Sequence, residues 1–316
     1  MSQKPKIAQH GRLMPQLEEV LNASFDVLPL WQHPVAVAAA LAHGQHVCAL
    51  VTSAPVGATA ALINALPQLK MVASFGVGFD KLDLDVLRSR RVPASYTPDV
   101  LNDCVADTAF GLLIDVARGL SASDRFVRRG DWLNGKFPLT TRVSGKRLGI
   151  LGLGRIGQTI ARRASGFDMQ VSYTNRKPVE GAGLTYEPSL LALADWADFL
   201  VVSAAGSAAT QHIVNAGVLA ALGPRGFLVN VSRGSLVDEA ALVQALQTKA
   251  IAGAGLDVFA DEPRIPEALL ALNNVVLLPH LASGTHETRQ AMADLVLENL
   301  HAHFSGQPLV TPIPGL

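Results

Sequence analysis

Three polar residues in the second half of the chain each follow an apolar run that is typical of a buried strand. They stand in Asn230-Val231-Ser232-Arg233-Gly234, Asp261-Glu262-Pro263 and Pro279-His280-Leu281. Because parallel strands end at one edge of a sheet, we expect Arg233, Glu262 and His280 to share a cleft. Taken one at a time, each has an interpretation without a function: Arg233 as a surface arginine, Glu262 as part of a solvated turn and His280 as a hydrogen-bonded histidine. Together they supply an anion clamp, a carboxylate that favours the imidazolium and a proton donor, which reduction of a 2-oxo acid needs.

A glycine-rich turn adds a second kind of chemistry. Gly152 permits a tight turn, Gly154 lets backbone N–H groups approach phosphate oxygens, and Gly157 lets a helix pack on its strand. The N-terminus of that helix offers N–H donors and a partial positive charge to a pyrophosphate. We therefore expect the whole turn to bind a dinucleotide: Gly152, Leu153, Gly154, Arg155, Ile156 and Gly157.

The segments around this turn distinguish a dinucleotide site from an ordinary glycine turn. Apolar runs predict strands over 147–151 and 170–174, and a helical pattern predicts a helix over 155–165 between them. These three elements form the βαβ unit that the glycine motif requires.

The end of the second strand of that unit indicates which dinucleotide binds. A chain that binds NAD usually offers Asp or Glu there to the ribose hydroxyls, whereas this chain has Asn175-Arg176-Lys177. Arg176 can bind a 2′-phosphate through its forked guanidinium, and Lys177 adds a point charge. The alternative is a solvated basic loop. The position favours the phosphate contact, so we predict NADPH as the cofactor, with NADH less favoured.

Length and composition restrict the class of protein. With 316 residues, 49% hydrophobic and 16% charged, the chain is typical of a two-domain globular enzyme. Its formal net charge is zero, which argues against a nucleic-acid partner. The apolar run 35–42 is far too short for a bilayer, and residues 1–11 hold no sustained apolar run, so a cytoplasmic protein without membrane contact is expected. Cys48 and Cys104 are expected as reduced core residues, with no metal role.

Apolar and helical runs alternate along the chain, which predicts an α/β fold with two doubly wound parallel-sheet, Rossmann-like domains and a cleft between them. We expect a substrate domain from 1–99 plus 286–316, and a dinucleotide-binding domain from 100–285. The substrate would bind beyond the carboxyl ends of the strands. Helices are expected over 58–66, 82–90, 102–129 and 286–304, and further strands over 47–51, 69–74, 199–202, 227–231, 255–259 and 275–278.

Several motifs in sequence order resemble the D-isomer-specific 2-hydroxyacid dehydrogenase family, over essentially the whole chain. Within that family the chain is similar to NADPH-dependent glyoxylate, hydroxypyruvate and hydroxyphenylpyruvate reductases. The motifs are Ser74-Phe75-Gly76-Val77-Gly78-Phe79-Asp80, Thr97-Pro98-Asp99-Val100, the turn from Gly152 to Gly157, and the segments 230–239, 253–263 and 278–289.

The resemblance implies a role for each matching residue in the catalytic set. His280 would protonate the carbonyl oxygen during reduction. Glu262 would hydrogen-bond to His280 and favour its imidazolium form. Arg233 would bind the carboxylate and the carbonyl of the substrate.

The resemblance also implies contacts around this set. The backbone N–H groups of Val77 and Gly78 would hold the other end of the substrate carboxylate, and Ser53 would line the pocket. Asp257 would orient the nicotinamide carboxamide, and Val231 would contact the same end of the cofactor through its backbone.

Departures from related enzymes narrow the expected activity. The similar formate dehydrogenases carry a glutamine at the position of Glu262, and many phosphoglycerate dehydrogenases carry a regulatory extension that this sequence lacks after its last helix. We expect reduction of glyoxylate and hydroxypyruvate, whereas an aromatic pocket would permit hydroxyphenylpyruvate. Phe75 and Phe79 flank the carboxylate loop, but they are equally compatible with the core.

Other classes of function give different expectations. A dinucleotide-sensing protein that binds a partner and turns over little would use the same cofactor turn, and an oxidoreductase of phosphite or another inorganic anion would need a more basic pocket. The resemblance implies a homodimer, with the helix over 102–129 as an interface element. In relatives, a residue of the partner from the region matching 132–137 can close the pocket.

Overall fold

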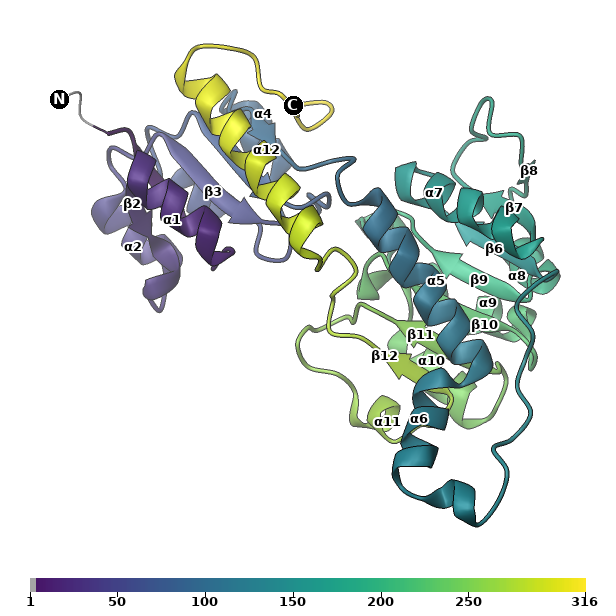
Figure 1. The fold of residues 1–316 in the computed structure, drawn as a ribbon. Helices are drawn as coiled ribbons and strands as arrows, with labels where there is room; N and C mark the ends of the chain where they lie inside the picture. Colours follow the sequence, from purple (N-terminus) through teal and green to yellow (C-terminus); the bar gives the residue numbers. More distant parts are fainter. Residues whose placement is uncertain (1–3) are drawn as a thin grey trace. The chain divides into compact units, whose positions relative to one another are not determined.

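The computed structural model describes residues 4–316, which form two compact units with one parallel sheet each (Figure 1). The first unit holds the chain up to Leu101 together with Thr285–Leu316, and the second holds Asn102–Gly284. Residues 1–3 of the predicted substrate domain lie outside the described part. Every pair of named strands is parallel, and helices lie on both faces of each sheet. The prediction of two doubly wound parallel-sheet domains is confirmed.

The first unit contains a five-stranded sheet with the order β2-β1-β3-β4-β5. All residues of β3 and β4 are buried, as in strands covered on both faces. Ser53 at the end of β3 pairs with Phe75 at the end of β4, so the loops after these strands leave the sheet side by side. The strands are β1 (Lys6–Gln9), β2 (Asp26–Pro29), β3 (Ala49–Ser53), β4 (Met71–Phe75) and β5 (Ala94–Ser95).

Helices bury apolar side chains on both faces of this sheet. On one face, α2, α3 and α4 share an apolar core with the strands. On the other, α12 packs on β4 and lies beside α1, where the Phe25 and Phe304 rings are 5.4 Å apart. The helices are α1 (Pro15–Ser24), α2 (Ala36–His43), α3 (Ala60–Asn64), α4 (Leu84–Ser89) and α12 (His286–Phe304), with a 3-10 turn η1 (Leu30–Gln32).

The second unit contains a seven-stranded sheet with the order β12-β11-β10-β9-β6-β7-β8. The chain builds outward from β6 through β7 to β8, then returns to β9 and builds the other way. Ligands of such sheets bind where the direction reverses, here between β6 and β9. The strands are β6 (Arg147–Leu151), β7 (Gln170–Thr174), β8 (Thr185–Tyr186), β9 (Phe199–Val202), β10 (Phe227–Asn230), β11 (Gly253–Leu256) and β12 (Val275–Leu277).

Two groups of helices cover this sheet. α5 packs on α7 and on β10, β11 and β12, whereas α8, α9 and α10 form the second layer. The helices are α5 (Asn102–Arg118), α6 (Leu120–Arg128), α7 (Arg155–Ala164), α8 (Leu190–Trp196), α9 (Ala216–Leu222), α10 (Glu239–Gln247) and α11 (Glu267–Leu270). The 3-10 turns are η2 (Asp131–Leu133), η3 (Ser165–Phe167), η4 (Ala208–Thr210) and η5 (Gly234–Leu236).

The predicted single helix over 102–129 is wrong, because the chain breaks at Gly119 into α5 and α6. Gly119 has φ +61°, a left-handed conformation that ends a helix. The Asp115 carboxylate then accepts hydrogen bonds from the backbone N–H of Ser121, at 2.8 Å, and from the Ser121 hydroxyl. These bonds hold the corner between the two helices.

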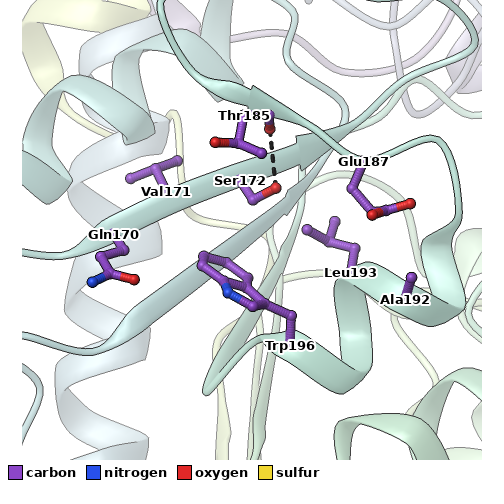
Figure 2. Close-up of a pocket in the computed structure, with 8 residues that line it drawn as sticks. All are labelled: Gln170, Val171, Ser172, Thr185, Glu187, Ala192, Leu193 and Trp196. Carbon is purple, nitrogen blue, oxygen red and sulfur yellow. Dashed lines mark hydrogen bonds between the residues drawn. The ribbon is translucent and has the colours of Figure 1, made fainter.

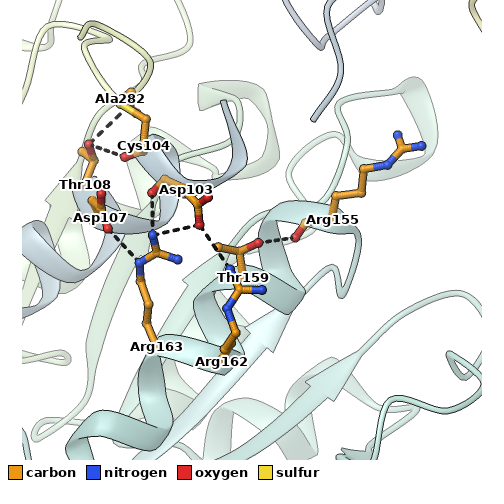
Figure 3. Close-up of polar contacts among 9 residues, drawn as sticks. All are labelled: Asp103, Cys104, Asp107, Thr108, Arg155, Thr159, Arg162, Arg163 and Ala282. Atoms are coloured by element: carbon orange, nitrogen blue, oxygen red, sulfur yellow. Dashed lines mark hydrogen bonds and ion pairs between the residues drawn. The ribbon is translucent and has the colours of Figure 1, made fainter. Parts of the chain in front are cut away.

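An ion-pair cluster anchors α5 to α7 (Figure 3). Arg163 Nε lies 2.7 Å from Asp107 Oδ1, and Arg163 and Arg162 lie 3.0 and 3.1 Å from Asp103 Oδ1. Exposed pairs are individually weak, but shared partners make this a network. The helix that begins the second unit is thereby tied to the helix that follows the glycine turn.

The cysteines differ from their prediction as core residues. Cys48 and Cys104 form no disulfide within residues 4–316, and both are only half-buried. Partial burial raises the pKa of the Cys48 thiol. Within residues 4–316, no helix is long and apolar enough to cross a membrane, and no three His, Cys, Asp or Glu side chains are grouped to hold a metal ion.

Candidate active site

The structure places Arg233, Glu262 and His280 after three neighbouring strands of the second unit. Arg233 follows β10, Glu262 follows β11 and His280 follows β12, and these strands are adjacent in the sheet. His280 Nδ1 lies 2.7 Å from Glu262 Oε2, with about a third of each side chain exposed. His280 and Glu262 are therefore in contact within a single unit, and Arg233 follows the neighbouring strand β10.

Glu262 is held at both carboxylate oxygens. Oε2 bonds to the His280 ring, and Oε1 accepts the backbone N–H of Phe259 at 3.0 Å. Burial alone would raise the pKa of Glu262, but the bonds from His280 and Phe259 and the charge of Arg233 hold this pKa below its usual value. Glu262 is thus a carboxylate at neutral pH, and it occupies the Nδ1 side of the imidazole.

The loops that carry Arg233 and Glu262 are packed backbone to backbone. A Cβ placed on Gly234 would lie 1.9 Å from the carbonyl carbon of Phe259, so only glycine allows this approach. The Arg233 guanidinium donates to the backbone oxygen of Ser232 at 2.9 Å. The residue after Arg233 therefore sets the distance to the loop of Glu262.

His280 stands in an uncommon backbone conformation with φ +53°. Its N–H donates to the backbone oxygen of Asp257 at 2.9 Å. The fully buried Asp257 carboxylate accepts the N–H of Leu281 at 2.7 Å and that of Ala282 at 3.0 Å. Burial raises the pKa of Asp257, while these two N–H bonds and the charge of His280 oppose the rise. The sequence predicted Asp257 only as a cofactor contact.

The three glycines of the turn after β6 differ in how much space a side chain would have. Gly152 has φ +97°, and a Cβ on it would lie 2.5 Å from the backbone of Ala204. A Cβ on Gly157 would lie 2.2 Å from the carbonyl oxygen of Gly152. A Cβ on Gly154 would meet no atom of residues 4–316 within 4 Å, and this residue is exposed, so packing within the described part of the chain does not require glycine there.

The remaining turn residues divide between core and surface. Leu153 is buried, Ile156 is half-buried, and Arg155 is exposed at the first position of α7. The backbone N–H of Leu153 donates to Asn175 Oδ1 at 2.8 Å. Asn175, predicted as a cofactor contact, therefore supports the glycine turn directly.

The loop after β7 presents the two basic residues to solvent. Arg176 and Lys177 are both exposed. Two tyrosines fix the loop around them, because the Tyr173 hydroxyl accepts the N–H of Val179 at 2.8 Å and the Tyr186 hydroxyl donates to the oxygen of Asn175 at 3.1 Å. Tyr186 belongs to β8, a short strand that the sequence did not predict.

In the first unit, Ser53, Val77 and Gly78 lie at the carboxyl ends of the adjacent strands β3 and β4. Gly76 leads into this loop with φ +144°, and a Cβ on it would lie 2.5 Å from that of Ala54. Its N–H donates to the hydroxyl of the buried Thr97 at 3.0 Å, and the N–H of Thr97 donates back to the Gly76 oxygen at 2.9 Å. The loop that carries Val77 and Gly78 is thus held at its first residue.

The buried Val231 donates its N–H to the backbone oxygen of Val202 at 3.3 Å, which keeps it at the end of β10.

A cavity of about 440 Å³ lies elsewhere in this unit, between the β7–β8 edge and α8 (Figure 2). Its lining includes Gln170, Ser172, Glu187 and Trp196, none of them a predicted site residue.

Comparison with known proteins identifies close relatives. The model of the D-isomer specific 2-hydroxyacid dehydrogenase NAD binding domain matches residues 110–282. A hydroxyphenylpyruvate reductase from Plectranthus scutellarioides is 48% identical over 297 residues, which are 94% of this chain and 95% of that protein. A glyoxylate/hydroxypyruvate reductase A from Arabidopsis thaliana is 46% identical with the same coverage.

Solved structures agree with these matches. A crystal structure of an NADPH-dependent glyoxylate/hydroxypyruvate reductase from Sinorhizobium meliloti, in complex with NADP and malonate, has a TM-score of 0.91 and 44% identity to this chain. The match covers 98% of this chain and 97% of that one.

Proposed function

Because this chain belongs to the D-isomer specific 2-hydroxyacid dehydrogenase family, we propose that it reduces glyoxylate and hydroxypyruvate with NADPH, using His280 as the proton donor. The family makes it an NAD(P)-dependent oxidoreductase. The observation that carries the proposal is the 2.7 Å contact between His280 and Glu262, on strand ends next to that of Arg233.

His280 supplies the proton that the carbonyl oxygen needs as it becomes a hydroxyl. Glu262 occupies Nδ1, so Nε2 is the ring atom left to donate the proton. The Glu262 carboxylate stabilises the imidazolium and fixes the ring orientation, as a carboxylate does in other histidine pairs. Arg233 pairs with the substrate carboxylate through its forked guanidinium, and its positive charge polarises the carbonyl.

Backbone groups complete the proposed substrate site. The N–H groups of Val77 and Gly78 are proposed to bind the substrate carboxylate as well, and Ser53 is proposed to line the pocket. The hold of Thr97 on Gly76 supports this assignment, because a fixed loop presents its N–H groups in one orientation.

The residues of the turn after β6 fit a dinucleotide. The open space at Gly154, next to the N-terminus of the ten-residue helix α7, leaves room for a pyrophosphate against backbone N–H groups. Leu153, Arg155 and Ile156 complete this turn. When bound, the nicotinamide supplies the hydride, and Asp257 and the backbone of Val231 would hold its carboxamide end.

The preference for NADPH rests on the loop after β7. Arg176 and Lys177 are exposed in a loop that Tyr173 and Tyr186 hold in place, and no acidic side chain stands beside them in Asn175-Arg176-Lys177. A 2′-phosphate gains charge-assisted bonds there, whereas NADH has a neutral 2′-hydroxyl at this position and no 2′-phosphate to bind.

A second substrate class has support from the relatives. The hydroxyphenylpyruvate reductase of Plectranthus scutellarioides and the glyoxylate/hydroxypyruvate reductase A of Arabidopsis thaliana match this chain almost equally well. We therefore keep hydroxyphenylpyruvate as the alternative substrate. The cytoplasmic location expected from the sequence stays a prediction.

We also propose a homodimer through the segment that includes α6. Helix α6 has no buried residue, and Leu133 and Leu139 beyond it are almost wholly exposed. A second copy would cover these side chains, since contiguous apolar surface marks an interface and a two-fold interface is self-complementary. Light scattering on the protein and on Leu133→Glu tests this: a dimer that the substitution dissociates supports it, and a monomeric parent contradicts it.

The test of the main proposal is the initial rate of oxidation of NADPH and of NADH, with glyoxylate, hydroxypyruvate and hydroxyphenylpyruvate in parallel. Fast turnover of the two small acids with NADPH supports the proposal. A higher rate with hydroxyphenylpyruvate favours the alternative, and tight cofactor binding without turnover of any 2-oxo acid indicates a dinucleotide sensor.

A further inference from the structure

Two buried polar side chains stand next to each other beneath the strand ends that carry the active-site residues. Asn230 is the last residue of β10 and is 1% exposed, and Asp257 directly follows β11 and is fully buried. Their neighbours in these strands are apolar or glycine. A buried amide and a buried carboxylate need bonding partners, so the groups they bond to indicate what they do.

Asn230 closes the turn that carries Arg233. Its Oδ1 accepts the N–H of Ser232 at 3.1 Å, and its Nδ2 donates to the backbone oxygen of Arg233 at 2.9 Å. One side chain therefore holds both the N–H of the residue before Arg233 and the carbonyl of Arg233 itself.

Asp257 holds the turn that carries His280 by three consecutive N–H groups. Its backbone oxygen accepts the N–H of His280, and its two carboxylate oxygens accept those of Leu281 and Ala282. The left-handed conformation of His280 is unfavourable for a non-glycine residue, and these bonds offset that cost. The last residue of this turn has a second contact, because the Thr108 hydroxyl of α5 donates to the backbone oxygen of Ala282 at 3.5 Å (Figure 3).

The two turns are connected to each other. The N–H of Asp257 donates to the backbone oxygen of Asn230 at 3.0 Å. A continuous path of hydrogen bonds thus runs from Arg233 through Asn230 and Asp257 to His280.

We propose that Asn230 and Asp257 are positioning residues: Asn230 sets the orientation of Arg233, and Asp257 sets that of His280 against Glu262. The inference rests on the proposed function of Arg233 and His280. It gives Asp257 a task in the protein itself, separate from the cofactor contact proposed above.

Loss of each residue has a different kinetic consequence. In Asp257→Asn, an amide NH₂ replaces one acceptor and faces a backbone N–H, so the His280 turn shifts. We expect kcat to fall by about 10²-fold, the cost of a catalytic group misplaced by roughly 1 Å, and this loss should exceed any rise in the NADPH Kd, which reports the separate cofactor contact of Asp257. In Asn230→Ala, we expect the KM for the oxo acid to rise by about tenfold, with a smaller change in kcat, because Arg233 binds the substrate carboxylate.

Asn299 offers a matched control. It is another fully buried asparagine, and it bonds to backbone and to Thr311 within the first unit. Asn299→Ala should destabilise the protein as Asn230→Ala does, yet leave KM and kcat unchanged. Equal kinetics of these two variants would overturn the role of Asn230.

Hydrogen exchange gives a readout that needs no turnover. In Asp257→Asn, the amides of residues 280–282 should exchange at least about tenfold faster, whereas those of β9 should not change. Unchanged exchange at 280–282, or a weakened NADPH Kd with an unaltered kcat, would overturn the role of Asp257. If Asp257→Asn fails to fold, Asn230→Ala decides the inference through KM. A parent protein without reductase activity refutes the proposed function instead, and the exchange result still tests the hold on the turn.

Discussion

The carboxyl edges of the two sheets share a turn geometry and differ in what they present. Gly76 after β4 and Gly152 after β6 both have positive φ, and a Cβ on either would lie 2.5 Å from an alanine of the neighbouring loop. The edge of the first sheet then offers backbone N–H groups at Val77 and Gly78. The edge of the second sheet also offers ionisable side chains, because Arg233, Glu262 and His280 follow its strands β10, β11 and β12.

The difference shows that a parallel sheet supplies only the place for a site. In both sheets a glycine with positive φ lets the chain turn tightly against a neighbouring loop, and such a turn leaves backbone N–H groups exposed. Ionisable groups need further support, which the second sheet provides through the buried side chains of Asn230 and Asp257. Function therefore follows the polar groups beneath the edge and not the fold itself.

The largest expected effect comes from the ionisable edge. His280→Ala should lower kcat by about 10²–10⁴-fold, the usual contribution of a general acid, and leave the NADPH Kd unchanged. The matched control is His212→Ala, since His212 is an exposed histidine of the same unit with φ +51°, close to that of His280. Steady-state kinetics with a fluorescence titration of NADPH decide the case: equal loss of cofactor binding would contradict the role of proton donor.

The basic loop after β7 should have the next largest effect. Replacing Arg176 and Lys177 with serine removes contacts worth about 1.5–3 kcal/mol, so the ratio of kcat/KM for NADPH over NADH should fall by roughly 10–100-fold. Arg225→Ser, at a position outside this loop, serves as the control. An unchanged ratio would remove the basis for NADPH preference.

Substitutions at two glycines of the turn after β6 should distinguish protein stability from NADPH binding. Gly152→Ala should destabilise the second unit by about 1–3 kcal/mol, because its φ of +97° and the contact with Ala204 exclude a side chain. Gly154→Ala should leave the free energy of unfolding nearly unchanged and weaken NADPH binding. Thermal melting with and without NADPH tests both, and a Gly154→Ala protein that binds NADPH normally would refute a pyrophosphate contact there.

The smallest effect concerns ion pairs in the two units. Asp198 accepts the N–H of Arg147 at 2.9 Å and pairs with its guanidinium; burial would raise the pKa of Asp198, but these bonds from Arg147 lower it. A lowered folded-state pKa stabilises the protein above the unfolded pKa and is lost as pH falls. Asp198→Asn should thus cost about 1 kcal/mol at neutral pH and nothing in acid, whereas Asp85→Asn, in the exposed pair with Arg88, should cost nothing at either pH. Melting temperatures at both pH values check this.

Sequence patterns were sufficient where one local signal defines an element. The runs 147–151, 170–174 and 199–202 and the helical stretch 286–304 match β6, β7, β9 and α12 residue for residue. Short runs with apolar residues define the strands, whereas the Thr285 cap and the left-handed Gly306 define the ends of α12. The break at Gly119 was missed, since the amphipathic pattern continues across it and the corner depends on Asp115 and Ser121. The short strand β8 was missed because two residues carry no period.

The candidate site shows the same limit. Motif spacing places Arg233, Glu262 and His280 on neighbouring strand ends, because strand order follows from the βαβ pattern. The hold of Asn230 and Asp257 on the turns could not be read from sequence, since it depends on backbone N–H groups up to 25 positions away. A polar residue at the end of an otherwise apolar strand was the one available signal.

The most direct test of the account is the pH dependence of kcat/KM for glyoxylate reduction, in the parent protein and in Glu262→Gln. Because the folded protein lowers the pKa of Glu262, the parent should keep its His280–Glu262 pair as pH falls, until below the ordinary glutamate range. In Glu262→Gln the neutral amide cannot pair with the His280 ring as a carboxylate does, so the plateau of kcat/KM should fall, and the acid-side loss that titration of Glu262 causes in the parent should be absent. Equal plateaus and the same acid-side loss in both proteins would contradict a proton donor that depends on Glu262.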